Sequence, residues 1–443
     1  MTAVFSDTTL TKESALNMIT EQKQNMIDSW RYRAQLYYLF NGIKNIAKDK
    51  RLLIVSFIYI AVCLSIRCFI SLDNSPNGFG KKWLFTLITV GVLIGFTYYK
   101  GKPMGAGKMM RCFIRIGFVS HVGETPLLMD KKIENGTYYL TFRNVSSIPL
   151  SQWQDKREFI ESGLNLNITD IKEHGKKYIV ITAASGENIL PDFIEWDDSY
   201  LPYKNFELAL GETYTGEVKV NLAVTPHALL AGSTGSGKTI LLKLLLMQSL
   251  KKGAKVYIAD FKGGVDFPRV WHNHDKCIFI TDKNDLKNKL DEIVIELHRR
   301  KALLSNSDCK DIDEYNHKLR KNLHRIIFAC DELAEVTEKS GLDKKQKELV
   351  SVIEASLSTI LRLGRAMGIH AFLSTQRPSR DVIPGVVVNN SDVRICGRAD
   401  NVLSEIVLDK VDAADLISKN AQGRFLTNDD VLFQAYWFDD SKL

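Results

Sequence analysis

The stretch that most limits how this chain can fold is LLAGSTGSGKTILLKLLLMQSL, residues 229–250. Its glycines and its Lys-Thr pair fit the pattern G-x-x-x-x-G-K-[ST], in which backbone N–H groups and a helix N-terminus face bound phosphates. The residues HALLAG before it predict a buried strand, and TILLKLLLMQSL after it predicts an apolar helix. A nucleotide phosphate loop requires this order of strand, loop and helix, which disfavours the alternative of a glycine-rich turn.

We expect the loop to bind the phosphates of a nucleoside triphosphate. The glycines matter because a side chain at those positions would block the approach of the backbone to the phosphates. The predicted nucleotide-binding residues are Gly232, Ser233, Thr234, Gly235, Ser236, Gly237, Lys238, Thr239 and Ile240.

Downstream of the loop, strand and helix patterns alternate, as in a parallel α/β core. AKVYIADFKGG predicts a strand that ends at Asp260, and LHRIIFACDELAEV predicts one that leads to the adjacent carboxylates Asp331 and Glu332. ATP hydrolysis needs such a pair, with one carboxylate to hold the magnesium shell and one to orient and deprotonate water. IHAFLSTQRPS predicts a further strand, whose last residues would sense the γ-phosphate at the carboxyl edge of the sheet.

The composition is that of a globular protein with ample core-forming residues. Its 443 residues should form about two or three domains, and the net charge of +7 alone does not indicate nucleic-acid binding. The seven cysteines form no C-x-x-C pair and no metal-type spacing with His, which favours a reducing cytosol over a disulfide framework or a zinc site.

Two segments, residues 52–72 and 83–99, are apolar and long enough to cross a bilayer core of roughly 30 Å. Buried core helices are the alternative, but such helices normally have a polar face. Lys and Arg residues precede the first span and follow the second, whereas the connection has two Lys at its end. The positive-inside rule then predicts a two-span protein of the cell membrane with both termini in the cytoplasm.

Four regions are expected. Residues 1–50 have helix-forming composition, and residues 51–99 form the transmembrane hairpin. Residues 100–207 change to a mixed pattern that predicts a small α+β domain, and residues 208–443 form the nucleotide-binding domain. The basic residues after the second span could bind anionic lipid or DNA, although a topology signal is the simpler interpretation.

Several motifs together resemble the FtsK/SpoIIIE family of hexameric DNA translocases. They are PHALLAGSTGSGKT, IADFKGG, ELHRRKALL, DIDEYN, IIFACDELAE, GRAMGIHAFLSTQRPSRDVIPGVVVNN and RFL. The resemblance implies a RecA-like P-loop ATPase core, a parallel sheet with flanking helices, that uses ATP and Mg²⁺. It also implies a homo-oligomer, expected to be a hexamer, that moves double-stranded DNA or, in a distinct branch, exports protein.

Residue roles follow from the resemblance. Lys238 would contact the β- and γ-phosphates, Thr239 the magnesium ion, Asp331 a magnesium-bound water, and Glu332 the attacking water. Gln376 resembles the family's sensor.

Other positions would act outside the chain's own nucleotide. Arg365 resembles an arginine finger delivered to a neighbouring subunit, and a surface arginine at a helix end is the alternative. Thr375 and Arg377 resemble pore residues that contact DNA phosphates, which would suit sequence-independent binding.

Two departures from the chromosome-segregating translocases refine the expectation. The segment GRADNVLSEIVLDK has Asn401 and Glu405 where those proteins have a basic loop, and no winged-helix reader of DNA sequence follows it before Leu443. A membrane hairpin with one motor is more similar to the coupling proteins of Gram-positive conjugative elements, including the TcpA type. Those proteins are thought to engage a relaxase and to deliver DNA to a transfer channel.

We therefore expect a membrane-anchored DNA-translocating ATPase that serves conjugation. The alternatives are a protein-export motor of the type VII kind, a chromosome-segregating translocase without the reader module, and a membrane scaffold that merely binds nucleotide. Type VII motors usually carry several ATPase modules, and this sequence contains one phosphate loop.

Overall fold

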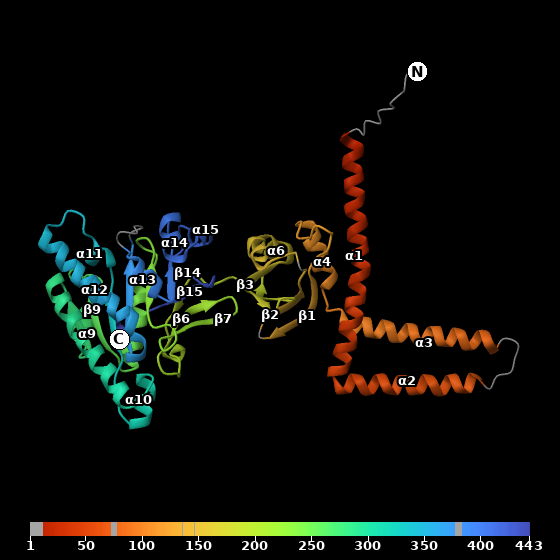
Figure 1. The fold of residues 1–443 in the computed structure, drawn as a ribbon, viewed down its shortest axis with the longest axis horizontal. Helices are drawn as coiled ribbons and strands as arrows, with labels where there is room; N and C mark the ends of the chain where they lie inside the picture. Colours follow the sequence, from red (N-terminus) through yellow and green to blue (C-terminus); the bar gives the residue numbers. More distant parts are fainter. Residues whose placement is uncertain (1–11, 72–77, 135, 146, 377–382) are drawn as a thin grey trace, which may run out of the picture. The chain divides into compact units, whose positions relative to one another are not determined.

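The computed structural model describes residues 12–71, 78–134, 136–145, 147–376 and 383–443 (Figure 1). Contacts between residues divide the chain into two compact units, Met1–Asn188 and Ile189–Leu443. The nucleotide-binding domain therefore begins earlier than the expected residue 208. The reason is that β5 (Ile194–Glu195) pairs with β15 (Leu432–Trp437) of that domain, and Trp196 is buried in its core.

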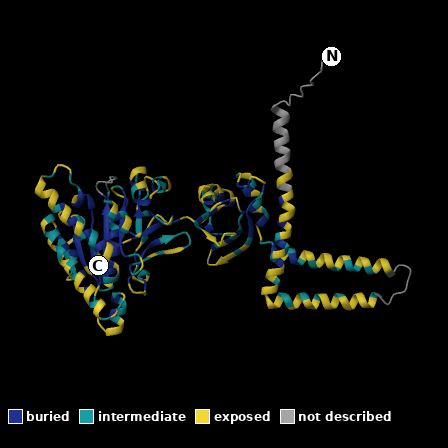
Figure 2. Ribbon diagram, viewed as in Figure 1, coloured by how far each residue is buried: buried dark blue, intermediate teal, exposed yellow. Residues whose placement is uncertain are grey.

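The first unit begins with three long helices, α1 (Lys12–Lys48), α2 (Lys50–Ser71) and α3 (Gly78–Gly101). Helix α2 contains residues 52–71 of the first predicted span, and α3 contains the second. Lys50–Ile70 and Phe79–Gly101 are long and apolar enough to cross a membrane. Their side chains are largely exposed within the structure (Figure 2).

Five Ser and Thr hydroxyl groups on α2 and α3 are satisfied within their own helices, which suits an apolar surrounding because no water is needed to pair them. Each donates to the carbonyl four residues earlier, and these residues are Ser56, Ser65, Thr86, Thr89 and Thr97.

The rest of the first unit is an α+β domain, as predicted for this region. Its antiparallel sheet has the order β1-β2-β4-β3. The elements are α4 (Ala106–Arg115), β1 (Leu127–Glu134), β2 (Thr137–Arg143), α5 (Leu150–Asp155), α6 (Arg157–Leu164), β3 (Leu166–His174) and β4 (Tyr178–Ser185). Trp153 is fully buried between the rings of Phe113, Phe118 and Phe142, and this aromatic group joins the helices to the sheet.

The second unit is built on one large sheet with the strand order β10-β9-β11-β12-β8-β13-β14-β15-β6-β7. The first six strands of this order are parallel, and β14, β15, β6 and β7 extend the sheet antiparallel. The remaining strands are β6 (Glu207–Thr213), β7 (Gly216–Asn221), β8 (Ala228–Ala231), β9 (Lys255–Ala259), β10 (Cys277–Ile280), β11 (Ile326–Cys330), β12 (Ile369–Thr375), β13 (Val393–Cys396) and β14 (Arg424–Thr427).

Helices cover both faces of this sheet, and each face has its own apolar core. One face carries α7 (Lys238–Lys251) and α8 (Arg269–His272). The other carries α9 (Lys283–Asn306), α11 (Leu333–Thr337), α12 (Lys344–Met367), α13 (Gly385–Asn390), α14 (Asn401–Leu408) and α15 (Asp412–Leu416). The central strands β8, β11 and β12 are fully buried, as expected for parallel strands covered on both faces.

Candidate active site

The phosphate loop joins β8 to α7, as the sequence predicts. Gly232, Gly235 and Gly237 have φ angles of +154°, +77° and +95°, a region that L side chains rarely adopt. A Cβ atom on Gly237 would also lie 2.9 Å from the backbone nitrogen of Gly423. The backbone conformation therefore favours glycine at all three positions, and space also requires it at Gly237.

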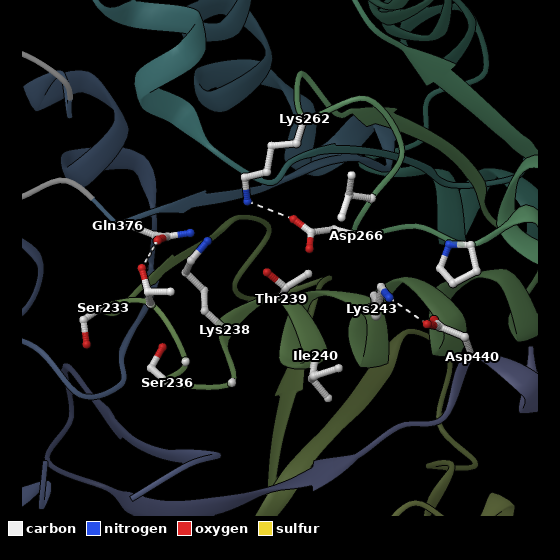
Figure 3. Close-up of a pocket in the computed structure, with 15 residues that line it drawn as sticks. Ser233, Ser236, Lys238, Thr239, Ile240, Lys243, Lys262, Asp266, Gln376 and Asp440 are labelled. Atoms are coloured by element: carbon white, nitrogen blue, oxygen red, sulfur yellow. Dashed lines mark hydrogen bonds and ion pairs between the residues drawn. The ribbon is translucent and has the colours of Figure 1, made fainter. Parts of the chain in front are cut away.

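A cavity of about 730 Å³ opens above this loop (Figure 3). Residues 233–240, eight of the nine predicted nucleotide-binding residues, line it, together with Lys262 and Gln376. The free N–H groups at the start of α7 lie beside the cavity, which is the arrangement that favours phosphate.

Lys238 is the first residue of α7, and its side chain is buried at the floor of the cavity. Its Nζ donates to the backbone oxygen of Asp331, at 3.0 Å, and to Oγ of Ser374. Burial lowers the pKa of Lys238, and the charge of the nearby Asp331 carboxylate opposes that change. The amine is thus held between the ends of β11 and β12, where it can meet a phosphate oxygen.

Thr239 and Asp331 bring together hard oxygen atoms of the kind that could hold a metal ion. Thr239 Oγ1 donates to Asp331 Oδ1 at 3.1 Å, and the Asp331 side chain is 2% exposed. Burial alone would raise the pKa of Asp331, but the charges of Lys238 and Lys262 outweigh burial and hold the pKa below its usual range. A hydroxyl beside an ionised carboxylate fits Mg²⁺, which prefers oxygen ligands and would neutralise charge on bound phosphates.

Lys262 is a site residue that the sequence analysis did not single out, although it lies in the quoted motif IADFKGG. Its Nζ lies 2.6 Å from Asp331 Oδ2. It also lies 2.9 Å from Asp266 Oδ2 (Figure 3). Burial would lower the pKa of Lys262, but the hydrogen bonds to the two carboxylates raise it, so the side chain stays charged. A cationic group thus already occupies one oxygen of the predicted metal ligand, which supports the fit of that carboxylate to a cation.

Glu332 follows Asp331 and caps α11. Its carboxylate accepts hydrogen bonds from Thr375 Oγ1 at 3.0 Å and from the backbone N–H of Gln376 at 3.2 Å. The Gln376 side-chain oxygen in turn accepts from Thr234 Oγ1 at 2.8 Å (Figure 3). These contacts link the phosphate loop to Glu332 through the end of β12, as a general base and a γ-phosphate sensor would require.

The two DNA-contact candidates have different outcomes. Thr375 is fully buried in β12 and its hydroxyl donates to Glu332, so the expectation that it faces a DNA pore is wrong. Arg377 lies outside the described residues, and its contact with DNA stays a prediction.

Arg398 is a second residue that the sequence analysis missed. Its Nε donates to Ser233 Oγ at 3.1 Å, its guanidinium also reaches the backbone oxygen of Thr234, and its own carbonyl accepts from the N–H of Ser233 at 2.7 Å. The guanidinium therefore holds the first half of the phosphate loop from the side of β13. The quoted segment GRADNV contains it, but nothing local indicates which arginine would fold back.

Arg365 lies far along the chain from these groups and at the other edge of the sheet. It belongs to the last turn of α12, just before β12 begins at Ile369, whereas the phosphate loop follows the carboxyl end of the parallel strand β8. Its exposed side chain donates from Nε to the backbone oxygen of Ala223 at 2.9 Å. This placement excludes contact with the nucleotide of its own subunit and leaves both the finger and the surface-residue interpretations open.

The fold and the site define a P-loop ATPase of the α/β class, with the predicted Lys238, Thr239, Asp331, Glu332 and Gln376 gathered at one edge of a parallel sheet. The individual catalytic roles of these residues stay predictions. Among the described residues, no group of three His, Cys, Asp or Glu side chains could hold a metal ion by itself.

Comparisons with known proteins identify the family. The FtsK/SpoIIIE family pattern matches residues 195–380. The solved structure of the pCW3 conjugation coupling protein TcpA, in its monomer form with ATPgS, is 36% identical, with a TM-score of 0.57 over 77% of this chain and 97% of that chain. The chain belongs to the FtsK/SpoIIIE family.

Curated relatives agree with this assignment over the motor region. A DNA translocase FtsK from Treponema pallidum is 34% identical over 47% of this chain, and the DNA translocase SftA from Bacillus subtilis is 32% identical over 48%. The matches cover 27% and 22% of those two relatives' own lengths, so this chain matches only a part of each.

Proposed function

We propose that this protein is a membrane-anchored, ATP-driven DNA translocase that acts as the coupling protein of a conjugative element. The observation that carries the proposal is the likeness to TcpA, which extends over 77% of this chain and is therefore longer than the motor unit Ile189–Leu443. A shared ATPase core alone would not explain a match of that length.

The site supports ATP hydrolysis as the source of energy. Lys238, Thr239 and Asp331 would hold the phosphates and Mg²⁺, and Glu332 would orient and deprotonate the attacking water. We further propose a homo-oligomer, a hexamer by analogy with the family, in which Arg365 serves a neighbour's nucleotide. Relaxase and channel proteins are the partners that a coupling role implies.

DNA-stimulated hydrolysis tests the proposal. The full chain is reconstituted in lipid vesicles, and ATP hydrolysis is measured alone, with double-stranded DNA, with single-stranded DNA and with an unfolded polypeptide. We expect DNA to raise the rate several-fold and Lys238→Ala to remove the activity, because Lys238 is the buried cation of the phosphate loop. Stimulation by polypeptide instead of DNA would replace the proposal with protein export.

Membrane topology is proposed with both termini in the cytoplasm. The basic residues that flank α2 and α3 support this orientation. A reporter inserted after Ser75, in a connection outside the described residues, should be extracytoplasmic, and one fused after Leu443 should be cytoplasmic. A cytoplasmic reporter at Ser75 would contradict the hairpin.

A further inference from the structure

Helix α1 crosses the ends of α2 and α3 at the same level. The side-chain amide of Asn41 donates to the backbone oxygens of Gly101, at the end of α3, and of Met129, in β1. Asn45 donates to the oxygen of Lys100 in the same way. A few residues later α1 ends, and Asp49 caps the start of α2 by accepting from the N–H of Arg51 at 2.9 Å.

The crossing is tight, which fixes its geometry. A Cβ atom on Gly42 would lie 1.8 Å from the oxygen of Thr97, and one on Gly101 would lie 1.8 Å from the oxygen of Tyr38. The backbones of α1 and α3 therefore touch, and neither glycine can be replaced without moving a helix.

Since α2 and α3 are neighbouring spans, the start of α2 and the end of α3 lie at one surface of the bilayer. Both of these points lie on α1, one near residue 41 and the other at residue 49. Because residues 41 and 49 of α1 both lie at this surface, α1 runs along the bilayer surface. Figure 1 shows this arrangement, with α1 running across the ends of α2 and α3.

The two faces of α1 have different surroundings. Trp30, Ala34 and Tyr38 share one face and are buried in the core of the α+β domain, where Trp30 Nε1 donates to Thr125. The opposite face carries Tyr32, Leu36, Phe40 and Ile43, spaced by three or four residues and 72%, 58%, 63% and 54% exposed. The α+β domain therefore lies on the side of α1 away from this apolar stripe.

We propose that the apolar stripe, defined as Tyr32, Leu36, Phe40 and Ile43, lies in the headgroup region of the membrane, so that α1 is an interfacial helix and the third membrane contact of the protein. The inference uses the proposed anchoring of α2 and α3. The stripe is continuous with those spans, because Ile43 lies between residue 41, where α1 meets α3, and residue 49, where α2 follows α1. Exposed Lys44 and Lys48 follow Ile43 and would contact anionic lipid headgroups, as in other interfacial helices.

Such a contact has a functional consequence. It would fix α1, and through Asn41 and Trp30 the α+β domain, at a set level on the membrane surface. A transmembrane hairpin alone can tilt and rotate in the bilayer. A hairpin joined to an interfacial helix resists both movements, because that helix would have to leave the membrane surface.

Depth-dependent quenching tests the proposal in the full chain. A fluorescent amino acid is placed singly at Leu36, Phe40, Gln35 or Val90, and each variant is reconstituted in vesicles of phosphatidylcholine and phosphatidylglycerol that carry bromine near the top or the bottom of the acyl chains. Interfacial helices sit about 5–10 Å into the boundary of headgroups and acyl chains. We expect shallow bromine to quench positions 36 and 40 more strongly than deep bromine does.

The other two positions are matched controls. Gln35 is exposed and adjacent to Leu36 but lies about 100° around the helix, so neither bromine should quench it strongly. Val90 is an exposed residue of α3, and deep bromine should quench it if the span inserts.

The outcomes separate the two proposals. Without quenching at Val90, the anchor itself fails. Quenching at Val90 without quenching at 36 and 40 overturns the interfacial helix alone. Protection of 36 and 40 from aqueous iodide without quenching by lipid bromine would also overturn it, because a protein surface would then cover the stripe.

Discussion

Lys262→Gln should lower the Mg²⁺ concentration that half-saturates the site. Lys262 Nζ lies 2.6 Å from Oδ2 of Asp331, the carboxylate proposed to hold the metal's water shell. The ammonium group and the metal ion therefore compete for the same negative charge. Glutamine keeps much of the side chain's length and polarity but removes the positive charge.

The structure sets the size of this effect. A hydrogen bond to a charged group contributes about 1.5–3 kcal/mol net. The Lys262 side chain is 36% exposed, so water screens its contact with Asp331, and we assign that contact about 1–2 kcal/mol. Its loss should lower the half-saturating Mg²⁺ concentration by a factor of about 5–30. Asp331 stays ionised in the variant because Lys238 Nζ is 3.8 Å from its Oδ1 and Thr239 still donates to it.

Two measurements check this prediction. One is ATP hydrolysis against free Mg²⁺ at saturating ATP, and the other is the Mg²⁺ concentration at which a fluorescent ATP analogue binds more tightly, which does not depend on turnover. Asp266→Asn is the matched control. This substitution removes the second carboxylate partner of Lys262, at 2.9 Å, so that Lys262 pairs with Asp331 alone. The Mg²⁺ concentration that half-saturates this variant should therefore equal or exceed that of the wild type. An unchanged or higher requirement in Lys262→Gln would refute the competition and indicate that Lys262 holds nucleotide phosphate.

Two further variants test the division of roles. Glu332→Gln should bind ATP normally and lose hydrolysis, because the amide oxygen can still accept from Thr375 but cannot take a proton; loss of nucleotide binding would show that the variant disturbs the site itself. Arg365→Ala should bind ATP and lose about 10³ to 10⁵ in rate if it is a finger, and mixing it with Lys238→Ala should restore activity wherever an intact Arg365 meets an intact loop. Background activity at every mixing ratio, with subunit exchange verified, would contradict a finger in trans.

The sequence predicted the positions of those site residues that local sequence patterns and the geometry of parallel strands determine. The strand, loop and helix around Lys238 could be predicted because glycine spacing and apolar runs are local signals. The pairing of Asp331 with the phosphate loop followed from the rule that parallel strands present their carboxyl ends at one edge.

Contacts between distant side chains could not be predicted in this way. Lys262 meets Asp331 across 69 residues, and Arg398 meets Ser233 across 165, and neither sequence neighbourhood specifies its partner. Thr375 was expected to contact DNA because its motif resembles that of the family's pore residues, and a motif does not specify the neighbours that a side chain meets in the fold. Burial of β12 on both faces places its hydroxyl against Glu332.

At the amino edge of the sheet, where Arg365 lies, hydrogen bonds and an ion pair connect neighbouring elements. His370 Nδ1 lies 3.0 Å from the oxygen of Pro226, so that nitrogen donates and Nε2 accepts from Arg325 Nη1 at 3.0 Å. Burial, and then the charge of Arg325, hold the pKa of His370 well below its usual range, so the ring stays neutral. Arg325 also pairs with Asp313, at the start of α10 (Ile312–Leu319), which ties that helix to the strand ends.

An amino edge with the exposed Arg365 and a carboxyl edge with the phosphate loop are two different surfaces of one domain. A contact that brings Arg365 of one copy to the phosphate loop of the next must therefore be heterologous, because the same patch cannot meet itself. Heterologous contacts close into rings when the rotation between copies allows it, and form open filaments when it does not. If the mixing experiment identifies Arg365 as a finger in trans, its place at the edge opposite the phosphate loop would make hydrolysis depend on assembly.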